Sequence, residues 1–235
     1  MAGWKRAADP SLRAHTRSPH ALHPINTVER ADVVGARLPP TKRQRTCSKS
    51  PSSSAAPAPI VSPTSRPPGS SQAPSPDRDL TLDVLDLREH PLPFFNEPAP
   101  PIYTGGQYSE SAAEAWRLKL AQYDAFIATV AEYNHGPTAV LKNALDSAQQ
   151  EWIRKPIAFV GYGGIGGARA IEHLRGIAIE LQMAPIKQEV NIAMEPYLGV
   201  VQQGRTLDDY EHLAQARTAL FEHLAWWASA LRAAR

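Results

Sequence analysis

Cysteine is nearly absent from this chain of 235 residues, and long apolar runs are absent as well. The one cysteine, Cys47, excludes an intrachain disulfide framework and leaves no thiolate cluster for zinc, so a reducing compartment fits. No stretch approaches the roughly 20 apolar residues that a membrane span needs. No apolar run follows Lys5 and Arg6, so we expect neither a secretory signal nor contact with a membrane.

Basic residues are concentrated near the start of the chain. Residues 1–50 contain ten Lys or Arg and three acids, a net charge of +7, so the other 185 residues carry −5. The cluster at residues 42–45 could attract nucleic acid or act as an address, and an Arg-rich, acid-poor segment is also typical of organelle transit peptides. We expect a cytoplasmic protein without a nucleic-acid partner, with nuclear or organelle targeting by the arm as the alternative.

Residues 1–79 have the composition of a disordered arm. They hold 13 of the 22 prolines, and most of the remainder is Ser, Ala and Arg. Proline blocks helices, and small side chains bury too little surface to offset the entropy of ordering. Residues 31–35 and 60–61 are two weak strand candidates within the arm. We therefore predict a disordered arm over residues 1–79 and a folded domain over residues 80–235.

From Leu80 onward the pattern indicates strands that alternate with helices. We predict strands at residues 80–87, 124–131, 157–160 and 185–192, and helices at residues 111–122, 138–152, 167–181 and 207–232. This alternation implies an α/β fold in which helices cover both faces of a parallel sheet. Ligands of such sheets bind at the carboxyl ends of the strands. The turns that follow the strands are therefore the places to look for a site.

Two of these turns have unusual compositions. After the second predicted strand come five residues that end in glycine: Glu132, Tyr133, Asn134, His135 and Gly136. Polar residues at a strand-to-helix turn expose backbone amides to electron-rich ligand atoms. The turn after the third strand, residues 161–167, has five glycines in seven residues, and glycine lets a ligand lie directly against the backbone. Tyr162 in that turn could add a ring face beside a flat ligand.

The spacing of Gly161, Gly163 and Gly166 also matches the dinucleotide-binding fingerprint. That fingerprint belongs on the first strand of its unit, whereas here one predicted strand and one helix follow. The acid that should meet the ribose would be Glu189, but it lies inside a predicted strand rather than at its end. The dinucleotide interpretation is therefore the weaker one.

The segments AEYNHGPTAVLKNALD and KPIAFVGYGGIGGARAIEHLR together resemble the NADPH-dependent FMN reductase family, which includes azoreductases and quinone reductases. The resemblance spans residues 80–235 and implies a flavodoxin-like, three-layer fold. It further implies FMN with NADPH or NADH, a small-molecule electron acceptor and a homo-oligomer. It places the flavin ring between Glu132, Tyr133, Asn134, His135 and Gly136 on one side and Tyr162, Gly163, Gly164, Gly166 and Gly167 on the other. No residue is assigned a catalytic or metal-binding role, because hydride transfer belongs to the cofactor.

The chain departs from the family pattern at its start. The family's first strand ends in a Gly-Ser-x-Arg-type loop that holds the FMN phosphate and opens a helix, and here the arm occupies that place. We therefore expect the first strand and helix to be missing or degraded, which would uncover an apolar face of the sheet. Residues 1–79 are either a genuine arm or the product of a shifted reading frame or a misplaced start or splice site. A non-catalytic, truncated flavodoxin-like protein and a basic-arm interaction module are the alternative functions.

Overall fold

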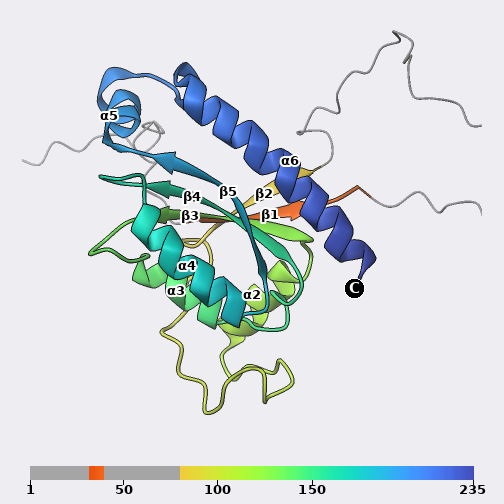
Figure 1. Cartoon of the computed structure of the whole chain (residues 1–235). Helices are drawn as coiled ribbons and strands as arrows, with labels where there is room; N and C mark the ends of the chain where they lie inside the picture. The colour runs from red at the N-terminus through yellow and green to blue at the C-terminus, as the bar shows by residue number, and fades with distance from the viewer. Residues whose placement is uncertain (1–31, 40–79) are drawn as a thin grey trace, which may run out of the picture.

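The computed structural model describes residues 32–39 and 80–235 (Figure 1). Its elements are β1 (Asp32–Arg37), β2 (Thr81–Asp86), α2 (Ser111–Leu120), β3 (Ala125–Ala131), α3 (Ala139–Asp146), β4 (Pro156–Tyr162), α4 (Ala168–Glu180), β5 (Ala184–Ile192), α5 (Met194–Gln203), the 3₁₀ helix η2 (Leu207–Asp209) and α6 (Glu211–Ala233). The four strands and four helices predicted from residue 80 onward are all present, with shifted ends. The helix α5 was not predicted.

The five strands form one sheet in the order β2-β1-β3-β4-β5, which is the order of flavodoxin-like folds. β3, β4 and β5 run parallel to one another. β1 is antiparallel to both of its neighbours, so β2 points in the same direction as β3. The predicted flavodoxin-like α/β fold is confirmed, with the difference that its central strand is reversed.

That central strand comes from the segment that the sequence analysis assigns to the arm. Val33 and Ala36 are almost fully buried, on opposite faces of the sheet. The chain leaves β1 at the edge where β3 begins, since the amide of Leu38 donates to Oδ2 of Asp124 at 3.2 Å. The place of the expected missing strand is thus filled by a strand of opposite direction. The other strand candidate, Cys47, the basic cluster and the family's first helix fall outside the described residues.

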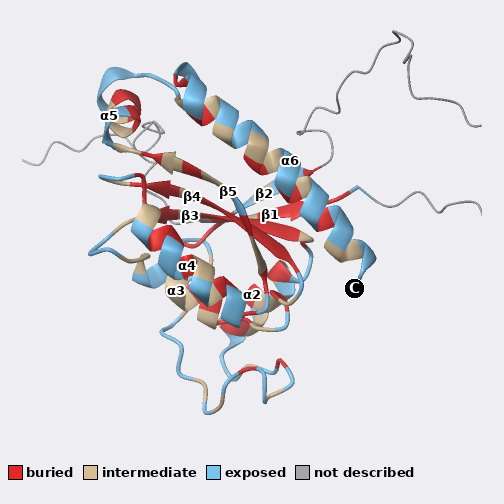
Figure 2. Ribbon diagram, in the orientation of Figure 1, coloured by how far each residue is buried: buried red, intermediate tan, exposed pale blue. Residues whose placement is uncertain are grey.

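Helices lie on both faces of the sheet, as Figures 1 and 2 show. α2, α3 and α4 cover one face, where Trp116, Phe126 and Trp152 form the centre of one core. α6 crosses the other face, and Leu213, Leu220 and Leu224 contribute to a second core there. The fold therefore has the three layers that the alternation of strands and helices predicts.

A buried lysine lies at the end of the first core where β4 begins. Lys155 is 8% exposed, and its Nζ donates to the carbonyl of Leu120 at 3.2 Å and lies 5.4 Å from the centre of the Phe126 ring. Burial, with a smaller contribution from nearby Arg235, lowers the pKa of Lys155 to about 8, although Asp124 and Glu151 oppose the shift. Between about pH 8 and pH 10.5 this amine is therefore mostly neutral in the folded chain and mostly protonated in the unfolded chain.

This lysine predicts stability that increases with pH. Above pH 8 the unfolded chain binds more protons than the folded one, so the free energy of unfolding should rise toward the ordinary pKa of 10.5. Between about pH 7.5 and 9.5 the wild type should gain roughly 2 kcal/mol relative to Lys155→Met. Urea unfolding of both proteins at the two pH values measures this difference. An identical pH dependence in the two proteins would contradict it.

Candidate functional site

The turn after β3 is a tight hairpin at the carboxyl edge of the sheet. Tyr133 and Gly136 pair through two backbone hydrogen bonds, with N–O distances of 3.1 and 2.9 Å. Asn134 and His135 between them have φ angles of 50° and 66°, the left-handed pair that a type I′ turn requires. Within the described part of the chain, the backbone amides of these two residues donate no hydrogen bond to the protein. The turn thus offers a ligand two backbone donors on exposed residues.

The glycine turn after β4 is packed against itself on one side and open on the other. A Cβ on Gly161 would lie 2.5 Å from the carbonyl oxygen of Gly166, and one on Gly167 would lie 2.7 Å from Cα of Gly161. Gly166 has a φ of 71° and packs against Asn191, whose side-chain amide donates to its carbonyl at 3.1 Å. Gly164 is exposed, and no atom lies within 4 Å of its potential Cβ.

These observations divide the glycines by task. Gly161 and Gly167 let the turn close on the start of α4, and Gly166 lets it pack against Asn191 of β5. Gly164 leaves free space beside the backbone, which is where a flat ligand could approach. Gly166 and Gly167, which the family resemblance also places against the ligand, are both buried in the structure.

The two turns are neighbours because β3 and β4 are paired to their ends. Ala131 lies opposite Tyr162, and the amide of Glu132 donates to the carbonyl of Tyr162 at 3.1 Å. A Cβ on Gly163 would be 3.6 Å from Cβ of Glu132. The structure therefore brings the two predicted segments together at one edge of the sheet.

The side chains of two predicted ligand residues have partners within the protein. The side chain of Glu132 is 5% exposed and forms an ion pair with Arg169. Tyr162 is 8% exposed, and its ring stacks on Tyr197 of α5 with a centroid separation of 6.3 Å and an interplanar angle of 3°. Its ring thus faces the second core. Tyr133 is 66% exposed and is the aromatic side chain that the first turn presents to solvent.

Arg169, which the sequence analysis did not single out, connects the two turns. Its Nε donates to Oε1 of Glu132 at 2.5 Å, and its backbone amide donates to Oε2 at 3.1 Å. Its Nη1 lies 2.9 Å from Nε2 of His135. Burial, the largest influence, acts to raise the pKa of Glu132, but the hydrogen bonds and charge of Arg169 outweigh it and hold that pKa below its ordinary value. A cation in the first turn of a helix is unfavourable next to the helix dipole. An arginine at this position in the sequence is therefore a sign that it binds a nearby acid.

The reversed β1 changes the edge where a flavin phosphate would be held. In this chain β1 begins, rather than ends, at the carboxyl edge, with Asp32 opposite Asp86. Asp86 in turn binds Arg88, whose Nη2 lies 2.6 Å from Oδ2. In residues 32–39 and 80–235, no loop leaves β1 at this edge. The described residues therefore fit the ring of a flavin at the two turns and do not supply an anchor for its phosphate.

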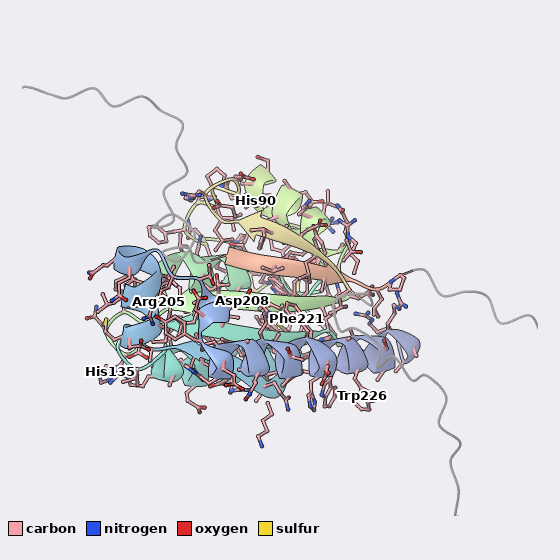
Figure 3. The ribbon with its side chains drawn as sticks, turned by 90° about the horizontal axis from the view of Figure 1, so that it is seen from above. His90, His135, Arg205, Asp208, Phe221 and Trp226 are labelled. Carbon is pink, nitrogen blue, oxygen red and sulfur yellow. The ribbon has the colours of Figure 1, made fainter. Side chains whose placement is uncertain are left out.

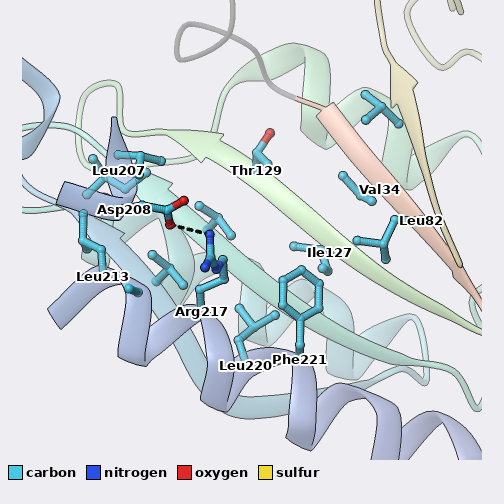
Figure 4. Close-up of a pocket in the computed structure, with 15 residues that line it drawn as sticks. Val34, Leu82, Ile127, Thr129, Leu207, Asp208, Leu213, Arg217, Leu220 and Phe221 are labelled. Atoms are coloured by element: carbon cyan, nitrogen blue, oxygen red, sulfur yellow. Dashed lines mark hydrogen bonds and ion pairs between the residues drawn. The ribbon is translucent and has the colours of Figure 1, made fainter. Parts of the chain in front are cut away.

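A separate cavity of about 330 Å³ lies between the sheet and α6 (Figure 4). Its walls are mostly aliphatic, with Phe221 at one side and the ion pair between Asp208 and Arg217 at one end. It adjoins Leu82 and Val84, which are 42% and 64% exposed on the face that the sequence analysis expected to be uncovered. Apart from Thr129 and this ion pair its lining is apolar, so the cavity has the character of a packing surface more than of a site for chemistry.

Other conspicuous side chains are scattered. Figure 3 shows His135 and Trp226 toward opposite ends of the molecule, with His90 on a third side. Among the described residues, no group of three His, Cys, Asp or Glu side chains could hold a metal ion. None of the described helices is both long enough and apolar enough to cross a membrane.

Comparison with known proteins links these turns to one family. The sequence model of the NADPH-dependent FMN reductase family matches residues 71–196, more than half of the chain. An NAD(P)H-dependent FMN reductase of Schizosaccharomyces pombe is 33% identical over 149 residues, covering 62% of this chain and 74% of that protein. An NAD(P)H:quinone oxidoreductase of Solanum tuberosum is 38% identical over 108 residues, covering 44% of this chain and 53% of that protein.

One solved structure matches part of the chain at lower identity. The flavoenzyme NAD(P)H:(acceptor) oxidoreductase FerB of Paracoccus denitrificans is 21% identical, with a TM-score of 0.48. The match covers 61% of this chain and 78% of that one.

Proposed function

Because the chain belongs to the NADPH-dependent FMN reductase family, we propose that it is an FMN-dependent NAD(P)H oxidoreductase that reduces a quinone, azo compound or flavin. The observation that supports this proposal is the pair of adjacent turns at the carboxyl edge of the sheet. One turn presents the amides of Asn134 and His135, and the other leaves open space at Gly164. A polar edge beside a flat, unobstructed surface suits the ring of a flavin.

The residues at this edge bind and orient the ring. The amides of Asn134 and His135 can donate to its electron-rich edge, and Gly164 lets it lie close to the backbone. Tyr133, which is exposed beside them, can cover part of the ring or of a nicotinamide. When bound, the flavin supplies hydride transfer between the nicotinamide and the acceptor. No side chain of this chain needs to transfer a proton to the reacting atoms.

The described residues supply no anchor for a flavin phosphate, and this leads to a specific prediction about ligand choice. Each hydrogen bond to a charged group contributes about 1.5–3 kcal/mol, so a complete phosphate site would favour FMN over riboflavin by far more than a hundredfold. With the ring half of the site in place, we expect the affinities of FMN and riboflavin to agree within about tenfold. Fluorescence titration of the two flavins measures the ratio, and bleaching of the bound flavin by NADPH or NADH tests reduction. A preference for FMN above about a hundredfold would contradict it.

A second candidate function is a flavodoxin-like protein that binds flavin poorly and does not catalyse a reaction. The reversed β1, which places Asp32 opposite Asp86 where a phosphate loop would lie, favours it. Purified protein without flavin absorption, whose melting temperature neither flavin raises, would support this candidate over the oxidoreductase.

We also propose that the protein is cytoplasmic and forms a homo-oligomer. Two exposed aromatic groups could contribute to the contact: Phe94, which is 84% exposed, and Trp226 on α6, which is 64% exposed. Sedimentation velocity of the wild type, Phe94→Ser and Trp226→Ser would test the assembly, and a monomeric wild type would contradict it.

A further inference from the structure

Arg169 binds to both turns of the candidate site at once. It is the second residue of α4, directly after the glycine turn, and reaches across to the end of β3. Its backbone amide and Nε hold the two carboxylate oxygens of Glu132, while Nη1 meets the ring of His135. A guanidinium has its donors in a fixed, planar fork, so these contacts set the relative position of the groups they join.

Glu132 is the fixed end of this connection. Its side chain is 5% exposed, and a buried carboxylate needs a partner because it has lost its water. It also lies against the glycine turn, where a Cβ on Gly163 would be 3.6 Å from its own Cβ. The pair of Glu132 and Arg169 therefore ties the end of β3 to the start of α4.

The contact between Arg169 and His135 depends on whether the imidazole is neutral. Arginine carries donors and no acceptor, so Nε2 of His135 can only accept the hydrogen bond from Nη1 at 2.9 Å. A protonated imidazole has no free acceptor, and it would place a second positive charge next to the guanidinium of Arg169. Among the described residues, the other titratable side chains near His135 are Tyr133 and Glu132, which are two and three positions earlier in the chain, and His173 on α4, whose Nδ1 lies 3.7 Å from the potential Cβ of Gly136. Of these, Glu132 is already bound by Arg169.

We propose that Arg169 is a positioning residue that holds the two turns at a fixed separation, and that it holds the first turn only while His135 is neutral. The role in flavin binding rests on the proposed function. Protonation of His135 releases the tip of the turn, and the amides of Asn134 and His135 lose their alignment with the ring. Flavin affinity then falls when His135 is protonated.

The first experiment compares flavin affinity across pH. From about pH 8 to about pH 5.5, the affinity of the wild type should fall about tenfold. His135→Asn keeps an acceptor and tolerates the left-handed backbone, so it should bind more weakly than the wild type at pH 8 but change little on acidification. Arg169→Lys keeps the charge without the fork, and we expect weak binding with a flat pH profile. His223→Asn on α6, far from the turns, is the matched control and should follow the wild type.

A second experiment needs no flavin. Melting temperatures of the wild type, Arg169→Lys, His135→Asn and the double variant give the coupling between the two side chains. We expect a coupling of a few degrees at pH 8 that disappears at pH 5.5. Coupling with this pH dependence in a protein that binds no flavin would support the connection and overturn the proposed function. Equal coupling at both pH values, or the same affinity profile in the wild type and His135→Asn, would overturn the connection itself.

Discussion

Gly167→Ala is expected to lower the free energy of unfolding by about 3 kcal/mol. Gly167 has a φ of 73°, which costs an alanine roughly 1–2 kcal/mol. Its new Cβ would also lie 2.7 Å from Cα of Gly161 and 2.8 Å from the backbone nitrogen of Tyr162. Both neighbours are backbone atoms, so no rotation of a side chain relieves the overlap. Urea unfolding, monitored by fluorescence of the buried tryptophans, measures the change.

Gly164→Ala is the matched control, and we expect it to lower flavin affinity while leaving stability almost unchanged. Nothing lies within 4 Å of its potential Cβ, so stability should change by less than about 0.5 kcal/mol. The added methyl group nevertheless occupies the space that we assign to the ring, so flavin affinity should fall by roughly tenfold or more. Equal stability of the two variants would show that the turn is not packed as described. Unchanged flavin affinity in Gly164→Ala would place the ring elsewhere.

The strands and helices from residue 80 onward could be predicted because their patterns are local. The alternation in β2 and the apolar runs of β3 and β4 depend on their own residues and on burial between two layers of helices. The helix α5 was missed because Pro196 and Gly199 weaken a pattern of only ten residues. Pro196 is tolerated there because it lies in the first turn, where no helical donor is lost.

The reversal of β1 could not be predicted from its residues. A six-residue strand shows the same two-residue period in either direction, and its direction is set by the strands on each side. Residues 31–35 are a weak strand candidate in the sequence, and Gly35 and the proline-rich surroundings are unfavourable in a central strand. The prediction of a missing or degraded first strand follows from the proline-rich arm in the place of the family's first loop. The pairing with β2 and β3 shows the strand that fills this position.

Within the site, the position of the two turns followed from the order of strands, but the direction of each side chain did not. Glu132 has the position of a ligand residue and is instead bound by Arg169, which lies 37 positions later in the chain. Tyr162 precedes the open part of its turn, yet its place at the end of β4 directs its ring to the second core. Such pairings depend on three-dimensional neighbours, and no short motif contains them.

Gly35→Ala tests whether β1 belongs to the sheet, and we expect it to cost about 3 kcal/mol of stability. A Cβ at Gly35 would overlap the ring atoms Cγ, Cδ1 and Cε1 of Tyr123, whose side chain is 2% exposed. That ring cannot move away easily, because it packs edge-on against Phe126 on one side and lies under the guanidinium of Arg37 on another. The substitution should therefore either strain the core or push β1 out of the sheet.

The matched control is Gly176→Ala, on the exposed side of α4. No atom lies within 4 Å of its potential Cβ, and alanine is the better helix former, so this variant should gain about 0.5–1 kcal/mol. Hydrogen exchange separates the two ways in which Gly35→Ala could act: loss of protection in β2 and β3 means that β1 has left, whereas retained protection means strain within an intact sheet. If Gly35→Ala were as stable as the wild type, residues 32–37 would not form the central strand. The sheet would then lack the strand on which its β2-β1-β3 order depends.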